Sequence, residues 1–134
     1  MTYAVLDASA IIALFRDEAG AQTIEALLID RQTTCIVHAV NLCEVFYGAV
    51  RDGGADAAYT MLDDITDLGI VVSEDLAPPF WQLAGLIKSS FRASLADCFG
   101  MALACWLDAT FYTSDHHELD TIAPLGICRI TFIR

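Results

Sequence analysis

Four acidic residues in this sequence are placed and flanked in a way that favours metal binding. Asp7 directly follows an apolar run, and Asp115 lies just past another. Glu44 and Asp97 each stand inside an apolar stretch. A carboxylate buried without a partner is costly, so such acids need hydrogen bonds or a cation. Few basic residues are nearby in the sequence, and Mg²⁺, which prefers oxygen ligands, fits that gap. A divalent cation held by carboxylates can assist the hydrolysis of a phosphodiester, so this pattern predicts a metal-dependent nuclease site.

Each acid taken alone also has an ordinary structural explanation. The spacings Asn41 to Glu44 and Ser94 to Asp97 resemble capping boxes, in which the acid bonds back to the start of a helix. The other two acids have the positions of a helix cap and of a turn residue. For one acid the structural explanation is preferred, and only the four together favour a site.

The elements that must position these acids alternate along the chain. Strands are predicted at 3–6, 34–40, 70–72, 111–113 and 127–133, and helices at 8–16, 20–31, 42–52, 55–69, 78–91 and 95–107. This alternation predicts a single α/β domain over residues 1–134, with a mostly parallel sheet of about five strands and helices on both faces. Ligands of such sheets bind beyond the carboxyl ends of the strands. Asp7 and Asp115 are expected there.

Composition limits the classes of function. The chain has 134 residues, of which 56% are hydrophobic, and its mean hydropathy is +0.52. A small domain cannot bury all of this apolar surface, so we expect a homodimer or another protein partner. The formal net charge of −11 disfavours a DNA-binding module, because phosphate repels an acidic surface. Contacts with a polynucleotide are then expected to be local, through Arg16, Arg51, Lys88 and Arg92.

The cysteines and the N-terminal residues indicate a compartment. The five cysteines form no C-x-x-C pair and lie in apolar contexts, which predicts reduced thiols and no zinc site. No apolar run approaches the ~20 residues of a membrane-spanning helix. The N-terminal residues lack the basic region of a signal peptide. We therefore expect a cytoplasmic protein.

Two rival chemistries have weaker support. His38, His116 and His117 are candidates for metal-free acid–base catalysis, but a loop histidine is more often a surface residue and His38 more often a satisfied polar group. A phosphoacceptor domain also gathers acids at strand ends. It needs an acidic pair after the first strand and a lysine near the last strands, whereas Asp7 stands alone and no lysine follows Arg92.

Four segments, in order, resemble the PIN domain, the nuclease fold of VapC-type toxins. They are VLDASA at 5–10, VNLCEV at 40–45, LADCFGMALA at 95–104 and YTSDHHEL at 112–119. Each segment alone is weak, but four in register over nearly the whole chain are fairly specific. The resemblance departs from the family at Cys98, where a small alanine is common, and in the loop with His116 and His117.

The resemblance implies a function and a set of site residues. It implies an endoribonuclease that uses Mg²⁺ or Mn²⁺ and is the toxin of a toxin–antitoxin pair, with an antitoxin protein as partner. Carried over by position, Asp7, Glu44, Asp97 and Asp115 match the acidic quartet of the family, with Asp7 and Asp97 as the main ligands. Ser9, Asn41 and Thr113 match supporting polar positions, and Glu118 falls where many members hold a further acid. A non-catalytic PIN-like interaction module remains the alternative.

Overall fold

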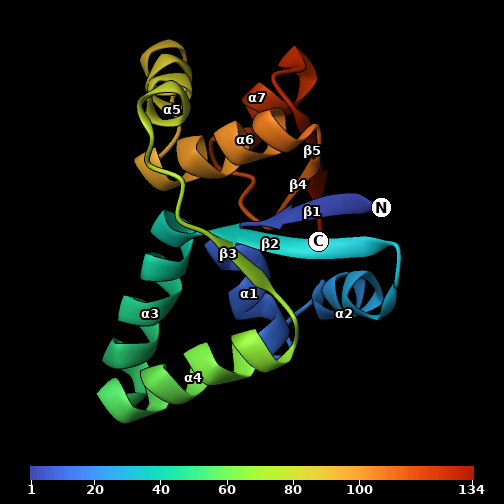
Figure 1. The fold of residues 1–134 in the computed structure, drawn as a ribbon, viewed down its shortest axis with the longest axis vertical. Helices are drawn as coiled ribbons and strands as arrows, with labels where there is room; N and C mark the ends of the chain where they lie inside the picture. The colour runs from blue at the N-terminus through green and yellow to red at the C-terminus, as the bar shows by residue number, and fades with distance from the viewer.

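The computed structural model describes all 134 residues as a parallel sheet covered by helices on both faces (Figure 1). The strands are β1 Thr2–Leu6, β2 Thr33–His38, β3 Val71–Ser73, β4 Thr110–Thr113 and β5 Arg129–Phe132. The helices are α1 Ala8–Phe15, α2 Ala21–Ile29, α3 Ala39–Gly53, α4 Ala55–Asp67, α5 Pro78–Ser90, α6 Leu95–Leu107 and α7 Leu119–Ile122, followed by a 3₁₀ turn at Ala123–Leu125.

The central strands have two buried faces because their apolar residues alternate between two cores. Val5 of β1 packs among side chains of α5, α6 and α7, while Leu6 packs with those of α1, α2 and α4. Ile36 and Val37 of β2 divide in the same way. Successive side chains of a strand point to opposite faces, so these continuous apolar runs need cover on both sides. Figure 1 shows α5 and α6 on one side of the sheet and α1, α2 and α4 on the other.

The strand order β3-β2-β1-β4-β5 creates the point at which a site is expected. All four pairings are parallel, where the sequence predicted a mostly parallel sheet. The chain leaves β1 towards β2 and β3 and returns to the other side of β1 as β4, so the order reverses between β1 and β4. The carboxyl ends of these two strands form the switch point. Asp7 and Asp115 follow them.

Helix α3 begins earlier than predicted. The sequence placed a strand at 34–40 and a helix from 42, with Asn41 and Glu44 as its capping box, but β2 ends at His38 and α3 begins at Ala39. His38 caps the helix, because its Nδ1 accepts a hydrogen bond from the Val40 backbone N–H at 3.1 Å. The capping-box interpretation of Asn41 and Glu44 is therefore wrong, and Glu44 lies in the second turn.

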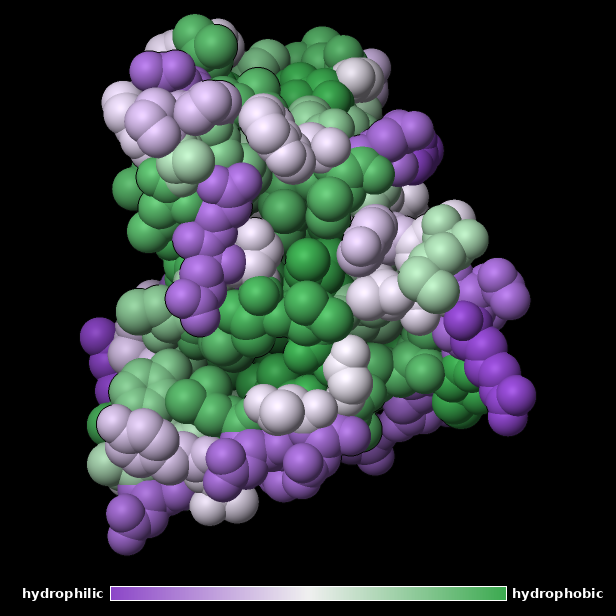
Figure 2. All heavy atoms as spheres, in the orientation of Figure 1, coloured by the Kyte–Doolittle hydropathy of each residue, from purple (hydrophilic) through white to green (hydrophobic).

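The surface retains much apolar area. Figure 2 shows a continuous hydrophobic region across the middle of the viewed face, with polar residues along its lower edge. Large apolar side chains are exposed on several elements, including Trp81 and Leu86 of α5 and Trp106 of α6. No helix has both the length and the apolar character needed to cross a membrane.

Candidate active site

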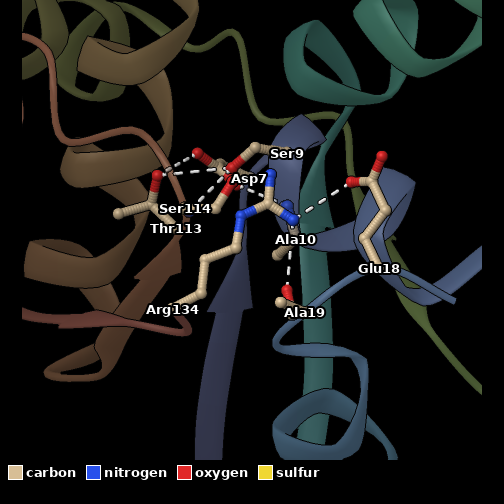
Figure 3. Close-up of polar contacts among 8 residues, drawn as sticks. All are labelled: Asp7, Ser9, Ala10, Glu18, Ala19, Thr113, Ser114 and Arg134. Atoms are coloured by element: carbon tan, nitrogen blue, oxygen red, sulfur yellow. Dashed lines mark hydrogen bonds and ion pairs between the residues drawn. The ribbon is translucent and has the colours of Figure 1, made fainter. Parts of the chain in front are cut away.

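Asp7 is the most deeply buried of the four acids and holds the start of α1. Its side chain is 3% exposed. One carboxylate oxygen, Oδ1, accepts hydrogen bonds from the Ala10 backbone N–H at 2.9 Å and from the Ser9 hydroxyl at 2.7 Å. The other, Oδ2, accepts from the Thr113 hydroxyl at 2.5 Å. The predicted helix cap is therefore present, and Ser9 and Thr113 fix the carboxylate from both sides (Figure 3).

The hydroxyls of Thr113 and Ser9 connect Asp7 to the segment that follows β4. Thr113 Oγ1 accepts a hydrogen bond from the Asp115 backbone N–H at 3.0 Å, and Ser9 Oγ accepts one from the Ser114 N–H at 2.9 Å. Figure 3 shows Asp7, Ser9, Thr113 and Ser114 gathered where the two strands end. The contribution of Ser114 was missed, because a backbone N–H leaves no signal in the sequence.

Asp115 is also a turn residue, as its position indicated. Its Oδ1 accepts a hydrogen bond from the His117 backbone N–H at 2.9 Å. Asp115 is half-buried. Its Oδ1 holds the turn by accepting from His117, and its Oδ2 has no hydrogen bond within the protein.

Glu44 and Asp97 come to the same place from α3 and α6. Ser94 caps α6 by accepting the Asp97 backbone N–H at 3.1 Å, which leaves the Asp97 carboxylate in the first turn, 8% exposed. Burial, followed by the negative charges of Asp7 and Asp115, raises the pKa of Asp97 to about 7. Burial also raises the pKa of Glu44, and the charges of Asp7 and Asp115 raise it further.

The four carboxylates therefore repel one another with no cation among them. Burial raises the pKa of Asp7 despite its three hydrogen bonds, and Asp115 adds to the rise. The ion pairs of Arg16, Arg129, Arg134 and His116 are all made with other acids. Arg134 extends across the start of α1 in Figure 3, but its guanidinium donates to Glu18 Oε1 and to the Ala19 carbonyl, both at 3.1 Å. The site is an uncompensated negative centre.

Asn41 is buried beside this centre with no hydrogen-bond partner. It is 1% exposed, and neither its Oδ1 nor its Nδ2 is bonded. A buried unpaired amide is costly, so an orphaned group of this kind marks a place for water or another ligand. Asn41 lies one turn before Glu44 on α3 and packs near Gly100, which lies one turn after Asp97 on α6. It therefore lies between the two helices that carry acids.

The remaining predicted residues have other surroundings. Glu118 precedes α7, and its side chain is in none of the hydrogen bonds that hold Asp7, although its charge contributes to raising the pKa of Cys98, next to Asp97. His38 is fully buried, and its Nε2 lies 2.9 Å from the Asp75 carbonyl. With Nδ1 accepting from Val40, Nε2 is the donor, and neither nitrogen is free for acid–base work.

His116 and His117 lie in the loop after Asp115 and are both exposed. His116 is bound to Asp120 and to the Arg134 carbonyl, each at 2.7 Å. These contacts raise its pKa, the Arg134 carbonyl contributing most. His116 therefore links the C-terminal Arg134 to this loop, and both of its ring nitrogens already have a partner.

The donor set suits a hard divalent cation. It consists of carboxylate oxygens and the unpaired amide of Asn41, and burial followed by neighbouring charges raises the pKa values of Asp7, Glu44 and Asp97. As placed, no three His, Cys, Asp or Glu side chains converge closely enough to hold an ion together. Mg²⁺ keeps several waters and is commonly bound by one or two carboxylates, so it does not require such a cluster. None of the four acids lines one of the five cavities of the molecule.

Comparison with known families decides the identity of the fold. The family model of the PIN domain matches residues 4–123. The chain belongs to the PIN-domain family. Members of this family are generally nucleases. None of the curated proteins compared with the chain matches it.

Solved structures agree with a PIN domain. A chain of VapBC2 from Rickettsia felis, bound to a DNA fragment from their promoter, has a TM-score of 0.74 at 14% identity, with 98% of each chain covered. VapC20 of Mycobacterium tuberculosis, a toxin that cleaves the sarcin–ricin loop, has a TM-score of 0.70 at 16% identity, covering 92% of this chain and 95% of its own. A toxin–antitoxin complex from Klebsiella pneumoniae has a TM-score of 0.71 at 16% identity, with 98% of each chain covered.

Proposed function

We propose that this PIN domain is a divalent-metal-dependent endoribonuclease that hydrolyses RNA phosphodiester bonds, and that it is the toxin of a type II toxin–antitoxin pair. One observation carries the proposal. The four carboxylates lie around the switch point of the sheet, where burial and neighbouring carboxylates raise the pKa values of Asp7, Glu44 and Asp97, and none of the four acids is in an ion pair. Such an arrangement is unfavourable by itself and becomes favourable when a cation is bound.

The surroundings of each residue indicate its role in the proposed site. Asp7 and Asp97, the two buried acids, are the main ligands of a Mg²⁺ or Mn²⁺ ion, and Glu44 and Asp115 complete the site directly or through water. Ser9 and Thr113 orient Asp7 by hydrogen bonds to its two oxygens, as supporting groups do around metal ligands. Asn41 has an unpaired amide for a bound water. The chemistry that a bound Mg²⁺ supplies in such sites is acidification of water and neutralisation of phosphate charge.

Contacts with RNA depend on basic residues beside the acids, because cations bind the phosphates. Of the basic residues expected to make local contacts, Arg16 is paired with Asp52, the guanidinium of Arg51 lies 4.9 Å from the centre of the Tyr47 ring, and Lys88 donates to the Ala93 carbonyl at 2.7 Å. Arg92, just before α6, is exposed and forms no ion pair. It is the cation we expect to meet RNA beside Asp97.

RNA cleavage by purified protein tests the proposal. EDTA should stop cleavage, added Mg²⁺ or Mn²⁺ should restore it, and Asp7→Asn should reduce the rate at least ~100-fold, as loss of a charged ligand does. The amide keeps the size of Asp7 and can still accept from Ala10, so the variant should fold. Asp63→Asn, an exposed acid on α4, is the matched control and should cleave normally. Turnover that survives EDTA, or full activity in Asp7→Asn, contradicts the proposal.

A non-catalytic interaction module has one observation in its favour. Asp7 and Asp115 already have structural roles as a helix cap and a turn residue, and a PIN fold retained only for protein binding would keep them. The same variant separates the two functions. In an interaction module Asp7→Asn changes stability alone, and the wild-type protein has no metal-dependent RNase activity.

The proposed partners follow from the neighbours and from the apolar surface. Similar folds occur in VapBC and other toxin–antitoxin complexes, which supports an antitoxin as partner of this chain. A cleft of about 250 Å³ between α1, α3 and α4, lined by Ile12, Phe15, Val45 and Met61 among others, offers apolar surface to such a protein. Growth arrest on expression, relieved by co-expression of a small protein encoded beside this gene, is the expected result. Arrest by Asp7→Asn as well would show that toxicity does not come from the nuclease.

A further inference from the structure

Two half-buried cysteines lie together at the edge of the sheet opposite the acidic site. Cys105 is in the last turn of α6, and Cys128 directly precedes β5. The Cys105 thiol donates a hydrogen bond to the carbonyl of Ile127, the neighbour of Cys128, at 3.0 Å. Both cysteines line one open cavity of about 290 Å³. We propose that Cys105 and Cys128 are a thiol pair that a small disulfide, such as oxidised glutathione, converts reversibly into an intramolecular disulfide.

The surroundings give the two thiols different roles. Interaction with the Cys128 thiol lowers the pKa of Cys105, while the neighbouring Cys105 sulfur and burial raise the pKa of Cys128. A thiol attacks a disulfide as its thiolate, so Cys105 is the attacking residue and Cys128 the resolving one. The Arg129 guanidinium lies near Cys128 and is held by Asp108, through Oδ1 at 3.1 Å and through its carbonyl at 2.6 Å. This positive group favours the Cys128 thiolate once the second step begins.

The reaction proceeds by two exchanges. The Cys105 thiolate attacks one sulfur of oxidised glutathione, forming a mixed disulfide and releasing one glutathione thiolate, which takes up a proton. Cys128 then loses its proton and attacks the Cys105 sulfur of the mixed disulfide, so a second glutathione leaves. The protein loses two hydrogens and two electrons in total. One glutathione disulfide becomes two thiols.

The other cysteines are not placed for this chemistry. Cys35 and Cys98 are buried in the two cores, and burial raises the pKa of each thiol. Cys43 is exposed on α3 and has no neighbouring cysteine. It is therefore a site for a single glutathione adduct and serves as an internal control for accessibility.

The disulfide would join the end of α6 to the start of β5. This link closes a loop that contains β4 and α7, so it restricts the unfolded chain and should raise the melting temperature. The loop also contains Thr113 and Asp115, but both lie at the opposite ends of the strands from the cysteines. The proposal does not depend on the nuclease activity, and its test needs no activity assay.

Peptide mapping after oxidation tests the pair. The intact protein is treated with oxidised glutathione, blocked with a thiol-alkylating reagent and digested without reduction. Cleavage after Lys and Arg leaves residues 93–129 as one peptide, so cleavage after acidic residues is required; it separates residues 98–108 from 121–134. We expect these two peptides to be linked and to separate on reduction. The oxidised protein should also melt several degrees higher and return to its original melting temperature with dithiothreitol.

Matched variants assign the link. Because the 98–108 peptide also holds Cys98, the cross-link should disappear in Cys105→Ser and in Cys128→Ser but persist in Cys43→Ser and Cys98→Ala. If Cys105→Ser fails to fold, a link that persists in Cys98→Ala still assigns it to Cys105, the one cysteine left in the 98–108 peptide. The proposal is overturned if the wild-type protein yields only single glutathione adducts, if Cys128 is linked to another cysteine, or if the link survives in Cys105→Ser.

Discussion

The pKa of Asp97 depends on its burial and on the charges of neighbouring carboxylates. Burial and the carboxylates of Asp7 and Asp115 raise its pKa to about 7, above the value near 4 of an unfolded chain. Between these two pH values the folded protein binds more protons than the unfolded chain, so the contribution of Asp97 to stability is present below pH ~4 and is lost as pH rises through ~7. The charged form of Asp97 is therefore a cost at pH 8 when no cation is present.

Replacing this charge should stabilise the metal-free protein. Asp97→Asn should raise the free energy of unfolding at pH 8 by roughly 1–3 kcal/mol, and the gain should shrink towards zero near pH 4. Urea unfolding in EDTA at the two pH values measures it, with Asp63→Asn as the exposed control. A loss of stability at pH 8, or a gain equal at both pH values, would show that the neighbouring charges do not govern Asp97.

At the scale of elements, the crossing of α3 and α6 positions Glu44, Asp97 and Asn41. Gly100 lets α6 pack closely against both β4 and α3, because a Cβ there would lie 2.4 Å from Cε1 of Phe111 on β4 and 3.3 Å from Nδ2 of Asn41 on α3. The aromatic ring is fully buried and cannot move away freely. Gly100 is thus a requirement of close packing.

Adding one methyl group tests this contact. Gly100→Ala should lower the free energy of unfolding by about 1–3 kcal/mol, as overpacking does in a well-packed core. Gly48→Ala is the matched control, because Gly48 lies in α3 with no atom within 4 Å of a new Cβ, and it should stabilise by about 0.5–1 kcal/mol. Thermal and urea unfolding compare the pair. Equal effects of the two substitutions would contradict the packing argument.

The sequence predicted most elements and missed those that have too little local signal. All five strands and six of the helices were predicted close to their observed bounds, because their apolar patterns and glycine or proline boundaries are local signals. Helix α7 was not predicted, since a four-residue helix has too few turns to show a pattern. The start of α3 was misplaced because a buried histidine as a cap has no sequence signal.

Part of the placement of the candidate site residues could be predicted. The positions of Asp7 and Asp115 at strand ends and of Asp97 at a helix start follow from the order of elements, whereas Glu44 lies one turn further into its helix than expected. The orphaned amide of Asn41 and the proximity of Cys105 to Cys128 do not follow from that order, because both arise from packing between segments far apart in the chain.

At the scale of the whole molecule, the apolar surface predicts self-association. Trp81 and Leu86 of α5 are 48% and 66% exposed, and large exposed apolar patches usually mark interfaces. Light scattering should give twice the chain mass of 14.6 kDa at high protein concentration. The mass should not fall at raised salt, because burial of apolar surface is not screened. A mass equal to one chain under these conditions would contradict the dimer.

The molecule as a whole has 18 acidic and 7 basic residues and a net charge of −11. Its proposed function depends on a cation held by four of these acids. Calorimetric titration of metal-free protein with Mn²⁺ tests this most directly, since it needs neither the RNA target nor the partner. We predict saturable binding by the wild-type protein and by Asp63→Asn, and binding at least ~10-fold weaker in Asp7→Asn and Asp97→Asn. Equal binding by all four proteins, or no saturable binding by the wild type, would contradict the assignment of the carboxylates as a metal site.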